Sequence, residues 1–287
     1  MSEYTLVPTK LTTIQKIIHL ADIHIRLYKR HAEYQEVFEN LYTSLKEQDL
    51  NNTAIVIVGD IVHSKTDMSP EMIKVASQFL KNMADLATTI IIAGNHDLSI
   101  SNPNRLDALT PLVENLKHKN LYYFKDSGIY QFADVQFGVH SIIGPPSEWP
   151  APENMKGTKI GLYHGPIHNA KTEAGFSITN KITLDSFKHY DMVMLGDIHL
   201  TQFLQEKTDN LPEVFYAGSL IQQNFGENIS GHGYAIWNVQ KKKVEKFVDV
   251  KNSYGYFTLT LQGTKIPDIH NMPDNVRLRI ICDKSVD

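Results

Sequence analysis

Five short polar segments follow one another along the chain, and each contains side chains that can bind a metal ion or move a proton. They are Asp22-Ile23-His24, Gly59-Asp60-Ile61-Val62-His63, Gly94-Asn95-His96-Asp97, Tyr163-His164-Gly165 and Gly196-Asp197-Ile198-His199. Carboxylates, a carboxamide and imidazoles are the donors that divalent manganese, iron and zinc accept. A single segment of this kind often occurs by chance. The ordered set predicts a dinuclear metal site of the type that hydrolyses phosphoesters.

The spacing suggests how the ligands are shared between two ions. Asp22 and His24 are two residues apart, so both side chains can reach the same ion. The Asp60 carboxylate can bridge two cations, an arrangement that suits in-line attack on phosphorus. Asn95 offers a neutral oxygen to the second ion. The other predicted ligands are His164, Asp197 and His199.

Three further residues are candidates for catalysis. His96 directly follows Asn95, so its side chain is expected to point away from the ions and toward the substrate. There it could donate a proton to the leaving oxygen or stabilise charge on phosphorus. Asp97 either orients the His96 imidazole or caps the loop. His63 either contacts a phosphate or lies at the rim of the site.

The remaining histidines and a basic segment are weaker candidates. His140 and His168 are close enough in sequence to the predicted site to be considered. A structural or solvated role is expected for His19, His31, His118, His189 and His270. The basic residues after the first segment either contact a nucleic-acid backbone or form a solvated turn; they are Arg26, Lys29 and Arg30.

Buried strands are expected to bring the five segments together, because four of them follow an apolar, β-branched run. The predicted parallel strands are residues 16–20, 54–58, 88–93, 159–163 and 191–195. Helical periodicity predicts helices over 34–45, from Ser69-Pro70 onward, and over 105–116. This alternation predicts an α/β sandwich of βαβ units, with the site at the carboxyl ends of the strands.

The later part of the chain has a different pattern. Antiparallel strands that form a second sheet are predicted at residues 214–217, 233–239, 244–250 and 256–261. Residues 264–275 contain two prolines and little periodicity, and 276–281 resemble one more strand without a visible partner. This unpaired strand suggests a truncated chain.

Composition restricts the class of protein. The chain has 287 residues, of which 42% are hydrophobic and 21% charged, as in ordinary globular proteins. A signal segment and a long apolar run are both lacking, and the single cysteine, Cys282, forbids an internal disulfide. We therefore expect an intracellular protein, cytoplasmic or nuclear, without a membrane partner. The formal net charge of -4 neither supports nor excludes DNA, because two divalent cations would cancel it.

The order of the five segments resembles the calcineurin-like metallophosphoesterase superfamily. A second signature is similar to the SbcD and Mre nucleases of DNA double-strand break repair: Tyr216-Ala217-Gly218-Ser219-Leu220, then Asn224-Phe225-Gly226-Glu227 and Gly233-Tyr234. The resemblance covers roughly residues 14–262. It implies a four-layer α/β/β/α sandwich, with a nuclease domain over 1–262 and the start of a DNA-capping domain over 263–287.

The resemblance also implies roles for individual residues. It assigns one manganese ion to Asp22, His24, Asp60 and His199, and the other to Asp60, Asn95, His164 and Asp197. His96 matches the catalytic histidine, and His63 matches the one that contacts phosphate. The family usually has histidine where this chain has Asp197, which leaves its metal preference and activity open.

The implied function is a manganese-dependent DNA exonuclease and endonuclease that acts at DNA ends, as the catalytic subunit of an SbcCD-like complex. Its implied partners are DNA, an SbcC-type ATPase bound through a segment absent from this sequence, and a second copy packed through the helices after the second and third motifs. Two alternatives remain open. One is a small-molecule or cyclic-nucleotide phosphodiesterase with the same dinuclear site. The other is a scaffold whose metal site is degenerate.

Overall fold

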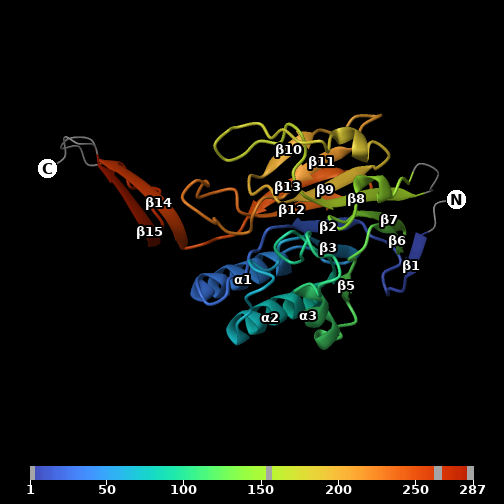
Figure 1. The fold of residues 1–287 in the computed structure, drawn as a ribbon, viewed down its shortest axis with the longest axis horizontal. Coiled ribbons are helices and arrows are strands. Elements are labelled where there is room, and N and C mark those ends of the chain that lie inside the picture. The colour runs from blue at the N-terminus through green and yellow to red at the C-terminus, as the bar shows by residue number, and fades with distance from the viewer. Residues whose placement is uncertain (1–3, 153–156, 262–266, 283–287) are drawn as a thin grey trace.

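Two β-sheets packed face to face form the body of the protein (Figure 1). The computed structural model describes residues 4–152, 157–261 and 267–282. Helices cover the outer face of the first sheet, so the expected α/β sandwich is confirmed. None of the helices in these three ranges is both long and apolar enough to cross a membrane.

The first sheet carries the first three polar segments. In spatial order its strands are β13 (Lys243–Asp249), β12 (Gly233–Asn238), β2 (Lys16–Leu20), β3 (Thr53–Val58), β4 (Thr88–Ile92) and β5 (Leu121–Tyr123). Strands β2 to β5 are parallel. Every residue of β3 is buried, because helices cover one face of the strand and the second sheet covers the other. This burial explains its uninterrupted apolar run.

Side-chain hydrogen bonds explain where two of the described helices begin. They are α1 (His31–Lys46), α2 (Pro70–Leu86) and α3 (Leu109–Leu116). The Ser69 side chain accepts a hydrogen bond from the Met72 amide, so α2 starts at the predicted position. Helix α3 starts later than predicted, because the Asp107 carboxylate accepts hydrogen bonds from the amides of Leu109 and Thr110.

The second sheet carries the last two polar segments. In spatial order its strands are β1 (Tyr4–Val7), β6 (Gly128–Phe132), β7 (Val135–His140), β8 (Thr158–His164), β9 (Met192–Gly196), β11 (Glu213–Tyr216) and β10 (Gln202–Gln205). Its inner face contributes Phe137, Leu162 and Met194 to a core shared with Val56 and Trp237 of the first sheet. In the described residues, the outer layer consists of loops with two 3₁₀ turns, Pro146–Glu148 and Leu184–Phe187.

The predicted arrangement of the later strands is confirmed in one part, because β12 and β13 pair antiparallel, but other strands pair differently from the prediction. Strand β11 pairs in parallel with β9, and β12 joins the first sheet beside β2 instead of forming a second sheet. Strand β14 (Tyr254–Leu261) pairs in parallel with β15 (Asn275–Cys282), so the strand predicted at 276–281 does have a partner. This two-stranded sheet projects from the body of the protein (Figure 1). The predicted domain boundary at 262–263 lies outside the described residues.

Candidate metal centre

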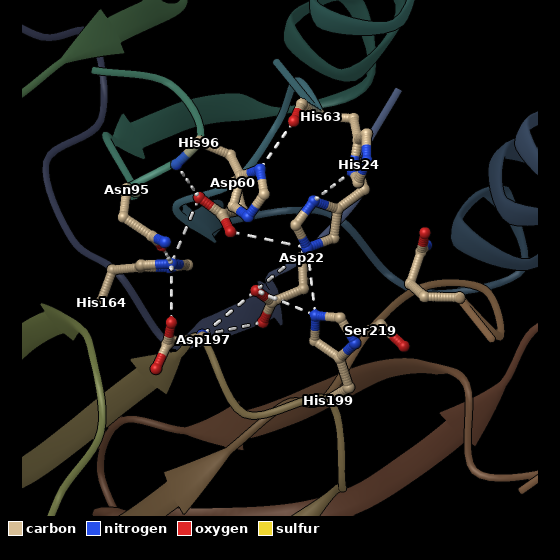
Figure 2. Close-up of polar contacts among 12 residues, drawn as sticks. Asp22, His24, Asp60, His63, Asn95, His96, His164, Asp197, His199 and Ser219 are labelled. Atoms are coloured by element: carbon tan, nitrogen blue, oxygen red, sulfur yellow. Dashed lines mark hydrogen bonds and ion pairs between the residues drawn. The ribbon is translucent and has the colours of Figure 1, made fainter. Parts of the chain in front are cut away.

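The five polar segments meet at the carboxyl ends of β2, β3, β4, β8 and β9, as predicted (Figure 2). The backbone turns sharply there, because Asp22, His24, Asp60 and Asp197 have φ angles of 53°, 52°, 53° and 92°. Residues other than glycine adopt this left-handed region at a cost, and such strain clusters at functional sites. The fold therefore holds four predicted ligands in conformations that an isolated peptide would disfavour.

Gly94 and Gly196 allow the segments to approach closely. A Cβ atom on Gly94 would lie 2.1 Å from Asp60 Oδ1, and one on Gly196 would lie 2.1 Å from the Val58 carbonyl oxygen. Both contacts are too short for any side chain. The glycines in the polar segments are therefore required by the packing of the site.

His24 lies at the centre of one group of predicted ligands. Its Nε2 atom is 3.0 Å from His199 Nε2, 3.5 Å from Asp60 Oδ2 and 3.8 Å from Asp22 Oδ1. The carboxylate oxygens and imidazole nitrogens point toward one position (Figure 2). Asp22, His24 and His199 are close enough together to hold one cation, and Asp60 lies beside them. This is the first ligand set that the family resemblance implies.

His164 lies at the centre of the other group. Its Nε2 atom is 3.2 Å from Asn95 Oδ1, 3.3 Å from Asp60 Oδ1 and 3.9 Å from Asp197 Oδ1. One oxygen of Asp60 faces each group, as a bridging carboxylate requires. The donor types and their convergence fit two divalent ions, with Asp60 shared between them.

The charges in this buried cluster support the same conclusion. Burial raises the pKa of Asp22 to about 7, although His164 and His199 oppose the shift. Burial also raises the pKa of Asp60, but the His164 and His24 charges, together with hydrogen bonds from His164 and the His96 amide, hold that pKa below its usual range. Burial lowers the pKa of His164, yet Asp60 raises it well above the ordinary value. The carboxylates thus need positive charge beside them, which divalent ions would provide.

Second contacts orient the ligand histidines. His199 Nδ1 lies 2.8 Å from Glu227 Oε1, and His164 Nδ1 lies 2.7 Å from the Val58 carbonyl oxygen. When each Nδ1–H donates to its acceptor, Nε2 is left to bind metal. Sequence reasoning did not assign this role to Glu227, although the residue belongs to the Asn224-Phe225-Gly226-Glu227 signature.

His96 lies beside the ligands, with a different set of contacts. Its Nδ1 is 2.6 Å from the His63 carbonyl oxygen and donates to it, while its backbone amide donates to Asp60 Oδ1 at 2.9 Å. The ring lies edge-on to His24, with the two centroids 4.8 Å apart. His96 Nε2 is therefore available to exchange a proton with a substrate.

The predicted orienting role of Asp97 is not what the structure shows. Its carboxylate accepts hydrogen bonds from the amides of Val62 and Gly94, both at 2.9 Å, and from Ile61 at 3.3 Å. Asp97 therefore caps the loop, which was the alternative expectation. The backbone carbonyl of His63 orients His96 instead.

His63 contacts an arginine inside the site. Arg26 Nη1 donates to His63 Nε2 at 2.9 Å, and Arg26 Nη2 donates to Gln223 Oε1 at 3.1 Å. Burial, assisted by the Arg26 charge, lowers the pKa of His63 to about 4, so its ring is neutral near pH 7. These side chains line a cavity of about 230 Å³ beside His96 and Asn224.

Of the basic residues after the first segment, Arg26 faces the site, whereas Arg30 pairs with Glu33.

The two weak histidine candidates do not join the cluster. His140 is buried against Tyr190, 2.8 Å from its hydroxyl, and His168 accepts a hydrogen bond from the Asn180 amide. His19 is buried in the core and contacts Trp237 Nε1, so its expected structural role is confirmed. His140 has a structural role of the same kind.

Comparison with known proteins identifies the family of this chain. The calcineurin-like phosphoesterase family matches residues 15–251 of this chain. The chain belongs to this family. The family uses divalent metals, and the His and Asp clusters described above are groups that could hold them.

Individual relatives add little about specificity. The chain is 42% identical to the uncharacterized protein R555 of Acanthamoeba polyphaga mimivirus over 96% of its own length, but spans 21% of that protein. It is 23% identical to a protein of Invertebrate iridescent virus 6, provisionally named phosphoesterase 244L, over 95% of both chains. The 5'-nucleotidase precursor of Thermus thermophilus aligns with 71% of this chain and 48% of its own, at 11% identity and a TM-score of 0.38.

Proposed function

We propose that this phosphoesterase is a manganese-dependent DNA nuclease that cleaves phosphodiester bonds at DNA ends during double-strand break repair. The supporting observation is the position of the segment that resembles SbcD and Mre nucleases. Its Glu227 contacts the ligand His199, and the nearby Gln223 and Asn224 line the cavity beside His96. The nuclease-like signature is thus part of the metal centre.

The chemistry of the site fits hydrolysis of a phosphodiester. Two divalent ions held by the ligand set would polarise the phosphate and activate a water molecule. His96 is positioned to exchange a proton with the substrate, and the Arg26 guanidinium offers donors to phosphate oxygens. Manganese is the proposed metal because Asp197 adds an oxygen donor, and manganese favours carboxylate ligands.

The alternative function is a small-molecule or cyclic-nucleotide phosphodiesterase with the same dinuclear site. A cavity of about 390 Å³ adjoins Asn95, His164 and Asp197, and this volume lies in the range of small-ligand pockets. The two functions differ in whether a polymer is required as substrate.

One assay separates the two functions. The protein is incubated with manganese and with labelled duplex DNA, single-stranded DNA, bis(p-nitrophenyl) phosphate or a cyclic nucleotide. We expect DNA cleavage that disappears with chelator and in the Asp60→Ala variant, which controls for contaminating nucleases. Hydrolysis of the cyclic nucleotide without any cleavage of DNA would contradict the nuclease function and support the alternative.

The resemblance also leads to proposals about binding partners and about the role of the two-stranded sheet. We propose an SbcC-type ATPase as the partner within the complex, a homodimer, and a DNA-capping role for β14 and β15. Large apolar residues of α2 and α3 pack in the core, since Phe79, Leu80 and Leu109 are fully buried. A dimer would therefore have to use other surfaces of the helices, such as the exposed Ile73 of α2.

A further inference from the structure

The larger cavity beside the metal centre has unusual walls for a phosphate site. It opens next to Asn95, His164 and Asp197, and most of its remaining lining is apolar or aromatic: Ile142, Pro146, Trp149, Tyr163, Pro166 and Ile182. No lysine or arginine lines this cavity among the described residues. It is therefore suited to an uncharged part of the substrate, while the phosphate is held at the metal centre.

Trp149 forms a fixed aromatic wall. Its Nε1 donates to the Ser141 carbonyl oxygen at 3.2 Å, and its ring centroid lies 4.6 Å from that of His140 and 5.0 Å from that of Tyr163. These contacts hold the indole in place before any ligand binds. A rigid ring of this size offers area for stacking at little cost in conformational entropy.

The smaller cavity at the metal centre is lined by polar and charged side chains instead of apolar ones. Arg26, His63 and Gln223 line the smaller cavity, with the arginine donating to both neighbours. Ligands of the second group, Asn95 and His164, border the aromatic cavity instead. A substrate that spans both cavities would have a planar apolar group on one side of its phosphate and polar or anionic groups on the other.

We propose that the aromatic cavity binds the nucleobase of the nucleotide whose phosphate lies at the metal centre. The inference rests on the proposed function, because it requires a nucleotide phosphoester as substrate. The base must be unpaired to enter a cavity of this size. The enzyme would therefore act on single-stranded or frayed ends in preference to fully paired DNA.

The first test compares two single-stranded oligonucleotides that differ at the terminal nucleotide, one intact and one abasic. Stacking of a base on an aromatic side chain contributes enough to change kcat/KM by about tenfold. We expect the intact end to be preferred by about that factor, and Trp149→Ala to reduce the preference to near one. Trp149→Phe should retain most of it. Phe176→Ala, which removes an aromatic ring that is 72% exposed, is the matched control and should leave the preference unchanged.

The second test does not depend on catalysis. The chain has two tryptophans, and Trp237 is buried between the sheets, so a ligand in the cavity should change the emission of Trp149. We expect a nucleoside monophosphate to quench the fluorescence, whereas deoxyribose 5-phosphate does not. Loss of the quenching in Trp149→Phe would assign the signal to this residue.

The outcomes distinguish the inference from the proposed function. Equal cleavage of intact and abasic ends, with no quenching by the nucleotide, would overturn the base site but leave the nuclease function in place. Quenching by the nucleotide and hydrolysis of cyclic nucleotides, without cleavage of DNA, would support the base site and overturn the nuclease function. Preference for the intact DNA end would identify the base of a strand terminus, rather than a free nucleotide, as the occupant.

Discussion

Three histidines at the predicted metal centre, His164, His199 and His96, each use Nδ1 for a hydrogen bond within the protein. Donation of Nδ1–H to Glu227 or to the Val58 carbonyl leaves His199 and His164 with Nε2 for metal. His96 uses the same atom to contact the His63 carbonyl, but its ring lies beside the ligand groups instead of within them. We therefore expect the three histidines to have different roles, because each ring is held in a different place.

Replacement of His96 tests this division of roles. His96→Ala should retain metal but reduce hydrolysis by about 10²–10⁴-fold, the usual contribution of a positioned acid or base. Asp60→Ala should lose metal as well, because Asp60 faces both ligand groups. Isothermal titration with manganese, together with the rate on DNA, separates the two effects. Release of metal by His96→Ala would show that His96 is a ligand.

Asp197 tests the departure from the family pattern. Its carboxylate lies 3.9 Å from His164 Nε2, and its own backbone amide donates to Asp22 at 3.0 Å. Asp197→His should preserve or raise manganese-dependent hydrolysis, because imidazole and carboxylate can both serve as ligands at this position. Rates measured across a manganese series check this. Complete loss of activity with metal still bound would indicate another role, such as general base.

At the level of elements, the end of strand β7 buries a histidine outside the predicted metal centre. Strand β7 ends at His140, which is buried among Trp149, Phe187 and Tyr190 on the outer face of the second sheet. The Tyr190 hydroxyl donates to the Pro150 carbonyl, so His140 Nε2–H donates to Tyr190. A proton on the other ring nitrogen would be buried without a hydrogen-bond partner among the described residues.

This packing predicts an acid-sensitive element. Burial lowers the pKa of His140 from 6.5 to about 3. Between these values the unfolded chain binds the proton and the folded one does not, so this contribution to stability declines as the pH falls below about 6.5. His140→Phe should therefore shift the midpoint of acid unfolding, followed by circular dichroism, to lower pH. An unchanged midpoint would mean that His140 is protonated in the folded state.

For the whole molecule, the metal centre joins the two sheets. The predicted ligands His24 and Asn95 follow strands of the first sheet, whereas His164 and His199 belong to segments of the second. Burial of several carboxylates at this junction costs stability unless positive charge accompanies them. Metal binding should therefore stabilise the packing of both sheets together.

Metal removal tests this coupling. At a free manganese concentration a hundred times Kd, binding to the folded state alone contributes about 2.7 kcal/mol. Differential scanning fluorimetry should show a higher Tm with manganese, reversed by chelator, and a much smaller change in Asp60→Ala. The same rise in Asp60→Ala would place the stabilising ions elsewhere.

The oligomeric state tests the proposed homodimer. Because the apolar residues Phe79, Leu80 and Leu109 pack in the core, we expect any self-association through these helices to be weak. Light scattering over a concentration series should show a mass that rises with concentration. A constant monomer mass at high concentration would contradict the dimer for this chain.

The sequence by itself determined which polar residues converge at the predicted metal centre, the strands that carry them and the start of α2. Buried parallel strands are continuous apolar runs, and Ser69-Pro70 caps its helix through neighbouring atoms, so these features are local. Tertiary structure decided the rest. Strands β11 and β12 carry similar patterns but enter different sheets, because pairing depends on partners far along the chain. Long-range contacts likewise place Glu227 on His199 and Arg26 on His63, and the fold alone brings Trp149 beside the metal centre.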